Sequence, residues 1–219
     1  MAHRTTKVRV RTSTQRSSGS TKWLQRQLND PYVQRAKKAG YRSRAAFKLI
    51  EIDQKHRLLK TGLRVVDLGS APGGWTQVAL ERGCRVVGVD LLAIPPIPGA
   101  TLLQADIEAP KTADLIIGAL GEKADLLLSD LAPSATGQRA VDRLRSEAMG
   151  ELVLALAPTL LRPGGRLLMK MLRGADAVLS REARISFKTV KLVRPDATRR
   201  ESSEIFLLAL DFKPDAAAG

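Results

Sequence analysis

The chain is poor in the residues that stabilise many secreted proteins and that hold metals. Its 219 residues include one cysteine, Cys84, and two histidines, His3 and His56. A single cysteine excludes a framework of internal disulfide bonds and suits a reducing compartment, so we expect a cytoplasmic protein. The histidines are isolated, and no cluster has the spacing of a metal site, so no metal is expected.

Long apolar runs and aromatic residues are also scarce. No apolar run approaches the roughly 18 residues that a membrane span needs, so we expect no membrane partner. Aromatic residues make up 4% of the chain, which is too few for extensive stacking on nucleic-acid bases. Hydrophobic residues still amount to 44%. That fraction is enough for the core of one domain of this length, which we expect to be a monomer.

Acidic residues are nearly absent from the first 60 positions. There, 16 Lys and Arg stand against three acids, whereas the rest of the chain holds 20 basic and 19 acidic residues. Such asymmetry is typical of nucleic-acid binders, and a solubilising tail is the alternative. Residues 1–20 have almost no apolar anchor and are predicted to be a disordered basic arm. An organellar transit peptide would have a similar composition.

Residues 21–60 are predicted to form a basic helical segment. One helix is expected from Thr21, a second from Pro31 to a cap at Gly40, and a third from Ser43. Four basic side chains of this segment are the candidates for gripping RNA phosphates: Lys37, Lys38, Arg42 and Arg44.

From residue 61 to 213 the pattern alternates between strands and helices, and 214–219 form a short tail. This alternation predicts a mostly parallel sheet with right-handed crossovers. Only about ten residues without helical pattern join the last two strands, so the last strand should be antiparallel. Strands are expected at 64–68, 85–89, 101–104, 124–129, 166–171, 187–193 and 204–211, with helices at 74–82, 111–121, 142–161 and 174–184. A seven-stranded sheet of this kind, with the last strand beside the fifth, is the arrangement of Rossmann-like methyltransferases.

The segment DLGSAPGGW at 67–75 follows an apolar strand and precedes a helix. A glycine-rich turn between a strand and a helix is the ligand-binding corner of doubly wound sheets. The glycines Gly69, Gly73 and Gly74 do not have the G-x-G-x-x-G spacing that cradles a dinucleotide pyrophosphate. The turn therefore favours a nucleoside without phosphates, and S-adenosylmethionine is the commonest such cofactor.

Acidic side chains follow the first three strands of the predicted sheet. Asp67 ends the first strand, Asp90 ends the second, and Asp106 follows the third. The carboxyl ends of parallel strands meet at the edge where ligands bind. There Asp90 is placed to accept hydrogen bonds from ribose hydroxyls, and Asp106 to read the adenine amine. Each acid alone is a weak signal, because aspartates often cap helices.

A second group of charged residues is expected at the same edge. Asp130 follows the fourth strand, and Lys170 lies inside the apolar fifth strand. Glu204 opens the last strand, which runs antiparallel, so its beginning reaches the same edge. Topology therefore predicts an active site around these three side chains.

The chain resembles the FtsJ/RlmE family of RNA 2′-O-ribose methyltransferases. The resemblance rests on RSRAAFKL at 42–49, the turn at 67–75, SDLAP at 129–133, and Lys170. It implies a class I methyltransferase that uses S-adenosylmethionine to methylate a uridine of 23S ribosomal RNA within the 50S subunit. It also implies a catalytic tetrad and a set of cofactor contacts: Lys48, Asp130, Lys170 and Glu204 for catalysis, and Gly73, Trp75, Asp90, Asp106 and Asp130 for the cofactor.

Two segments depart from the family pattern. Met171-Leu172-Arg173-Gly174 stands where the bacterial family has an aromatic-Gln-Gly run, and Gln104-Ala105-Asp106 replaces Gln-Gly-Asp. The first departure affects the expected substrate contacts. A methyltransferase of transfer RNA or of an mRNA cap, and a non-catalytic RNA-binding protein of ribosome assembly, are the alternatives.

Overall fold

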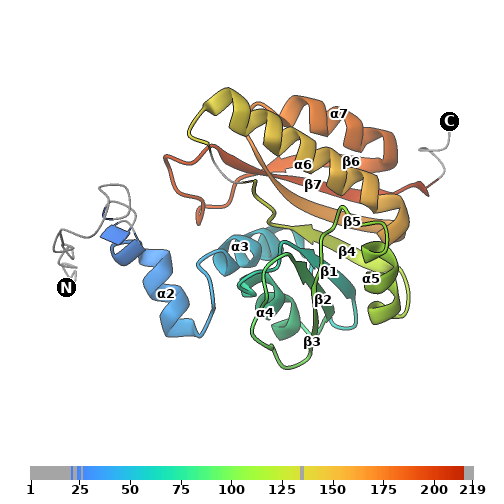
Figure 1. Ribbon diagram of the computed structural model, residues 1–219, viewed down its shortest axis with the longest axis horizontal. Helices are drawn as coiled ribbons and strands as arrows, with labels where there is room; N and C mark the ends of the chain where they lie inside the picture. Colours follow the sequence, from blue (N-terminus) through green and yellow to red (C-terminus); the bar gives the residue numbers. More distant parts are fainter. Residues whose placement is uncertain (1–20, 22–23, 26, 134–135, 215–219) are drawn as a thin grey trace.

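The computed structural model describes residues 21, 24–25, 27–133 and 136–214 (Figure 1). The predicted arm 1–20, Trp23 and all but the first residue of the predicted tail lie outside the described residues. In chain order the elements are α2 (Pro31–Ala39), α3 (Ala46–His56), β1 (Arg64–Leu68), α4 (Gly74–Glu81), β2 (Arg85–Asp90), β3 (Ala100–Gln104), α5 (Thr112–Leu120), β4 (Ala124–Ser129), α6 (Arg139–Leu160), β5 (Leu161–Leu172), α7 (Asp176–Ser186), β6 (Phe187–Val193) and β7 (Glu204–Phe212).

The strands form one seven-stranded sheet in the order β3-β2-β1-β4-β5-β7-β6. The five strands β1 to β5 pair in parallel, whereas β7 lies antiparallel between β5 and β6. The predicted Rossmann-like topology and the antiparallel last strand are confirmed. The order places the ends of β1, β4 and β5 and the beginning of β7 along one edge, which is where the candidate site lies.

Helices cover both faces of the sheet (Figure 1). The strands are apolar on both sides because both are buried. In β4, for example, Leu127 packs toward α5, α6 and α7, while Leu126 and Leu128 pack toward α3 and α4. Alternation along a strand therefore decides which helix layer each side chain meets. None of the described helices is long and apolar enough to cross a membrane.

The N-terminal helices are built into the domain. Helix α2 begins at Pro31 after Asp30, whose carboxylate accepts the Tyr32 N–H at 3.0 Å, and it ends at the left-handed Gly40. Aspartate is a favoured N-cap, and proline fits the first helical position. Helix α3 shares a hydrophobic cluster with β1, β4, β5 and β7. It is thus one of the layers that cover the sheet.

Three elements begin three or more residues away from the predicted start, and the other predicted starts differ by at most two residues. Helix α3 begins at Ala46 rather than Ser43, because the Ser43 hydroxyl accepts the Ala45 N–H at 2.9 Å and forms a turn first. Helix α6 starts three residues earlier than predicted, at Arg139. Strand β5 starts at Leu161 rather than 166, and its register to β4 shifts between Ala124 and Leu126, which accommodates the Pro-Gly-Gly segment as an irregularity.

Candidate active site

The glycine turn after β1 brings backbone segments into contact that side chains would separate. At Gly69, φ is +74°, and a Cβ there would lie 3.0 Å from the backbone nitrogen of Leu131. A Cβ at Gly88 of β2 would lie 2.8 Å from the Ser70 hydroxyl. The turn therefore packs closely on β2 and on the segment after β4, as only glycine permits.

Asp90 holds this turn in place from the end of β2. One carboxylate oxygen accepts the Ala71 N–H at 2.9 Å, and the other accepts the Leu92 N–H at 2.9 Å. Each carboxylate oxygen has a second lone pair, so the group can still accept hydrogen bonds from a ligand. Asp106, after β3, accepts the Glu108 N–H at 2.9 Å in the same manner.

A cavity of about 510 Å³ lies at the carboxyl ends of β1, β2, β3 and β4. It is lined by the glycine turn, by four acids and by apolar side chains, among them Leu91 and Leu92, which are 66% and 67% exposed. Its volume is that of a small-molecule site. Acceptors for hydroxyl and amine groups beside apolar walls match a nucleoside. The predicted cofactor residues Asp90, Asp106 and Asp130 all line it.

Asp67 lies completely buried below this cavity. One carboxylate oxygen accepts the Thr76 hydroxyl at 2.7 Å, while the other, Oδ1, has no hydrogen-bond partner. Burial raises the pKa of Asp67 to about 7, helped by the nearby negative charges of Asp130 and Asp90. The hydrogen bond from Thr76 acts in the opposite direction. The carboxyl group thus titrates close to neutral pH.

Two lysine–carboxylate pairs lie where the sequence predicted the tetrad. Lys170 Nζ is 2.9 Å from Asp130 Oδ1 and also donates to the Asp130 carbonyl. Lys48 Nζ is 2.6 Å and 2.8 Å from the two carboxylate oxygens of Glu204. All four side chains are at most 20% exposed. Ion pairs this sheltered hold their geometry better than surface pairs do.

The sheet explains why these pairs share one neighbourhood. Lys170 is opposite Phe206 in the β5–β7 register, and Glu204 comes two residues before Phe206 on the same face. Phe206 belongs to the cluster under α3, and the ammonium of Lys48, an α3 residue, lies 5.7 Å from its ring centre. Phe206 therefore forms an apolar floor shared by both lysines, and α3 closes the site from above.

Trp75 and Gly73, the other two predicted cofactor contacts, lie beside the glycine turn but outside the lining of this cavity. Trp75 is 3% exposed, its indole N–H donates to the Ala45 carbonyl at 2.8 Å, and its ring packs 5.8 Å from that of Phe206. Neither residue lines the 510 Å³ cavity. Gly73, with φ +112°, leaves room for Ile97, because a Cβ would lie 2.5 Å from its Cδ1. Their cofactor contacts stay predictions.

The two arginines predicted to bind RNA phosphates form hydrogen bonds and an ion pair with other parts of this chain. Arg42 donates to the carbonyls of Pro72, Pro95 and Pro96, which joins the glycine turn to the 95–96 segment. Arg44 pairs with Asp30 at 2.8 Å and also donates to the Ala197 carbonyl. Burial lowers the pKa of Arg44, and the charge of Asp30 opposes that effect. In contrast, Lys37 and Lys38 are exposed at the last turn of α2.

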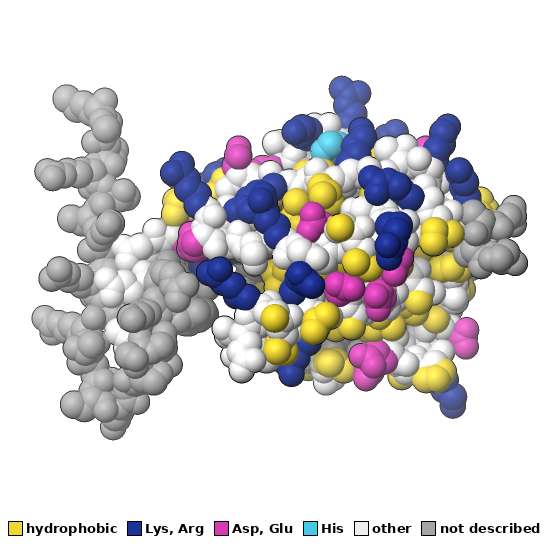
Figure 2. All heavy atoms as spheres, turned by 90° about the horizontal axis from the view of Figure 1, so that it is seen from above, with side chains coloured by type: hydrophobic (Ala, Val, Ile, Leu, Met, Phe, Trp, Pro, Cys, Tyr) yellow, Lys and Arg dark blue, Asp and Glu magenta, His cyan; other side chains and the backbone are white. Residues whose placement is uncertain are grey.

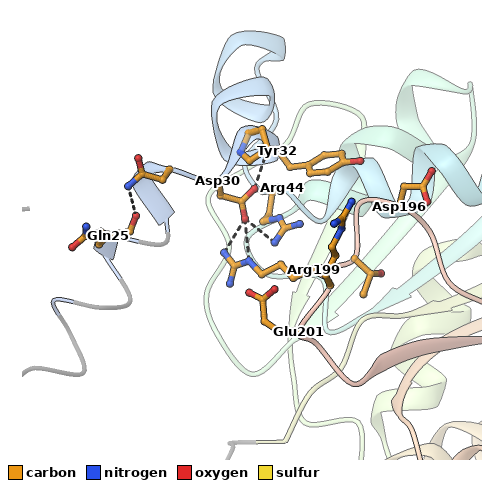
Figure 3. Close-up of a pocket in the computed structure, with 11 residues that line it drawn as sticks. Gln25, Asp30, Tyr32, Arg44, Asp196, Arg199 and Glu201 are labelled. Carbon is orange, nitrogen blue, oxygen red and sulfur yellow. Dashed lines mark hydrogen bonds and ion pairs between the residues drawn. The ribbon is translucent and has the colours of Figure 1, made fainter. Parts of the chain in front are cut away.

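A larger cavity, about 910 Å³, surrounds this Asp30 cluster (Figure 3). Asp30 is 7% exposed, and its Oδ2 atom contacts both Arg44, at 2.8 Å, and Arg199, at 3.0 Å (Figure 3). Sequence reasoning missed this cluster, because Asp30 and Arg199 are 169 residues apart. The available signal was a connection between the last two strands that carries three arginines.

The sheet order and the flanking helices define a Rossmann-like α/β protein, with an acid-lined cavity at the carboxyl ends of its parallel strands. The chain belongs to the FtsJ-like methyltransferase family, whose model matches residues 41–212. It is 50% identical, over 96% of its length and 85% of the relative, to a protein of Xanthobacter autotrophicus named Ribosomal RNA large subunit methyltransferase E. A relative of the same name from Acidiphilium cryptum is 48% identical over 95% of this chain and 94% of the relative. The structure superposes with a TM-score of 0.72 on a ribosomal RNA methyltransferase from Plasmodium falciparum, 30% identical, covering 78% of this chain and 98% of that one.

Proposed function

We propose that the protein transfers a methyl group from S-adenosylmethionine to the ribose 2′-hydroxyl of a uridine in 23S ribosomal RNA, within the 50S subunit. The observation that carries this proposal is the pair of sheltered lysine–carboxylate contacts beside a nucleoside-sized cavity. Family membership supports a methyl donor, and the names of the relatives support large-subunit ribosomal RNA as the substrate.

The residues of the cavity fit S-adenosylmethionine. Asp90 and Asp106 offer carboxylate acceptors for ribose hydroxyls and for the adenine amine, while Leu91 and Leu92 offer an apolar wall for the base. Asp130 lines the cavity and also pairs with Lys170. It therefore joins the cofactor cavity to the catalytic pair. When bound, S-adenosylmethionine supplies a methyl group on a positively charged sulfur. The hydroxyl oxygen accepts this methyl group as the hydroxyl loses its proton.

The side chains of the site orient that hydroxyl group. Lys170 is the candidate general base and Asp130 orients it, while Lys48, which pairs with Glu204, positions the ribose. Fixing the angle between hydroxyl and methyl donor supplies much of the acceleration in such a transfer. Lys170 stands where it can either take the proton or steer the oxygen by donating a hydrogen bond. The two roles predict different dependences of the rate on pH.

The test measures methyl transfer to 50S subunits, free 23S RNA and transfer RNA, using S-adenosylmethionine with a tritiated methyl group. Labelled 2′-O-methyl nucleotides should appear in the large-subunit RNA only. Lys170→Met should lower turnover by about 100-fold or more, the usual scale for a positioned acid or base. Label in transfer RNA alone would support the alternative that the protein is a methyltransferase of transfer RNA. No label on any RNA, with tight RNA binding, would support a non-catalytic assembly protein.

Cofactor binding serves as the control for Lys170→Met. The dissociation constant for S-adenosylmethionine, measured by calorimetry, should stay within a few-fold of the wild-type value, because Lys170 does not line the cavity. Near-normal turnover in this variant would overturn the proposed role of Lys170. With chemistry rate-limiting, a rate that rises with pH supports the base, and a rate independent of pH supports steering.

A further inference from the structure

A second cleft rich in arginine lies next to the catalytic edge and contains none of the residues discussed above as catalytic or cofactor-binding. Its volume is about 620 Å³, and it lies between the start of α6, the end of β5 and the β6–β7 connection. Five arginines and two acids line it. We name it the arginine cleft: Arg139, Arg143, Arg173, Arg194 and Arg200, with Asp142 and Glu201.

None of the five guanidinium groups takes part in an ion pair with a described residue. Among the described residues, no ion pair involves Arg139, Arg143, Arg173 or Arg200, all of which are exposed. Arg194 donates to the carbonyls of Arg199 and Arg200 and so shapes the connection. In the Asp30 cavity, by contrast, a buried carboxylate already pairs with Arg44 and Arg199, although Arg200 lines both spaces. The arginine cleft therefore has cationic groups available for an outside anion.

The two acids of the cleft cancel only part of this charge, because five guanidinium groups face two carboxylates. Asp142 accepts hydrogen bonds from the Thr136 N–H and hydroxyl, both at 2.7 Å, and from the Gly137 N–H. These bonds, the backbone bond from Thr136 foremost, lower the pKa of Asp142. The ionised Asp142 carboxylate is thus bonded to the turn before α6. Glu201 is exposed to solvent on the connection. Seen from the α6–α7 side, Lys and Arg side chains spread over the left and upper parts of the molecular face (Figure 2).

Close backbone contacts hold the walls of the cleft in fixed positions. Gly174, with φ +100°, lets the stem of Arg143 lie against the turn after β5, because a Cβ there would be 2.5 Å from Arg143 Cδ. The Arg173 N–H donates to the Ser203 carbonyl at 2.9 Å, which ties this turn to the β6–β7 connection. The guanidinium groups of three segments are thereby held around one space. Arginine forks of this kind pair with phosphate through two parallel hydrogen bonds.

The same contacts join the cleft to the catalytic edge. Leu172, which lines the cleft, is opposite Glu204 in the β5–β7 register. The lining residue Ser202 accepts the Glu204 N–H on its hydroxyl at 3.2 Å. An anion in the cleft would therefore lie directly beside the tetrad.

From this placement we infer that the arginine cleft binds a backbone phosphodiester of the RNA strand that carries the target ribose. The inference rests on the proposed function for the identity of the strand. The phosphate would hold the strand so that the 2′-hydroxyl enters the site next to Lys170 and Glu204. Arg173, one of the positions that depart from the family pattern, would contribute to this contact.

The test compares Arg143→Gln/Arg173→Gln with a control, Lys60→Gln/Arg181→Gln, which removes the same charge from two exposed sites outside the cleft. Binding to a 23S RNA transcript is measured by filter binding over a range of salt concentrations. Each phosphate that the protein no longer neutralises lowers the slope of log K against log salt by about 0.7 to 0.9. The cleft variant should show a slope smaller by roughly 1.5 and bind about tenfold more weakly at low salt, while the control changes little.

Methylation kinetics separate this inference from the proposed function. In the cleft variant, KM for the RNA should rise while kcat and S-adenosylmethionine binding stay near wild type. An unchanged slope and KM, or an equal change in the control, would overturn the inference even if methylation is confirmed. If the wild-type protein methylates no RNA, the proposed function fails, and the salt slopes still decide whether the cleft binds RNA. Inorganic phosphate is also added as a competitor in the binding assay. If the cleft variant differs from wild type only in its inhibition by this phosphate, the cleft binds free anions and the inference is overturned.

Discussion

Replacing Asp67 by asparagine should change how the stability of the ligand-free protein depends on pH. Asparagine resembles the protonated form of this buried carboxyl group and can keep the bond from the Thr76 hydroxyl. The pKa of Asp67 is raised in the folded protein from 3.8 to about 7. A raised pKa of an acid means that the folded state binds the proton more tightly than the unfolded state does. Wild-type stability therefore falls as the pH rises from about 4 to 7, and Asp67→Asn escapes this loss.

The size of the effect follows from the shift in pKa. A difference of about three units corresponds to about 4 kcal/mol of unfolding free energy at about 1.36 kcal/mol per unit. Roughly 2.5 kcal/mol of it should develop between about pH 5 and pH 8. The physical origin is the cost of removing a carboxylate from water when one oxygen, Oδ1, has no partner to replace it.

Urea unfolding of both proteins at a series of pH values measures this difference directly. Contributions from titrating groups that do not interact with Asp67 are common to the two proteins and cancel in the comparison. Asp114→Asn, which changes an exposed carboxylate of α5, is the matched control and should show little dependence on pH. The difference in unfolding free energy between wild type and Asp67→Asn could also stay constant from pH 5 to 8. That result would contradict the raised pKa, because Asp67 would then titrate alike in the folded and unfolded states.

Two further predictions concern packing away from the catalytic edge. Asp30→Ala should cost about 3 kcal/mol in urea unfolding, because it leaves Arg44 and Arg199 partly buried without their carboxylate; a loss below about 1 kcal/mol would mean that both guanidinium groups rehydrate freely. Gly150→Ala should cost about 1 to 3 kcal/mol, since its Cβ would lie 2.4 Å from Leu179 Cδ1. In a Leu179→Ala background the same change should be nearly neutral, and equal costs in both backgrounds would contradict the contact.

Much of the fold could be predicted because its signals are local. The seven strands and the helices between them follow from side-chain periods of 2 and 3.6 residues, which neighbouring residues encode. The position of β7 followed from a short connection that leaves no room for a crossover helix. The fifth strand was predicted to begin at Arg166, yet β5 begins at Leu161 and includes the Pro-Gly-Gly segment, because pairing to β4 tolerates a shift in register there.

The candidate site was predicted in composition but not in all its contacts. Asp90, Asp106 and Asp130 line one cavity, as strand-end acids of a parallel sheet should. The position of Trp75 in the core below Phe206 could not be predicted, since the residue follows the glycine turn directly in the sequence. An aromatic ring beside a binding turn can point either way, and packing against distant strands decides between the two.

The sequence by itself determined the glycine turn, the acids at the strand ends and the basic first 60 residues, because each is a property of neighbouring positions or of composition. Only the tertiary structure decided which lysine pairs with which carboxylate, that Arg44 is neutralised by Asp30, and that arginines from three segments meet in one cleft. Those contacts join residues far apart in the chain. Their energies depend on burial and on the path of the backbone over the sheet, which no local pattern records.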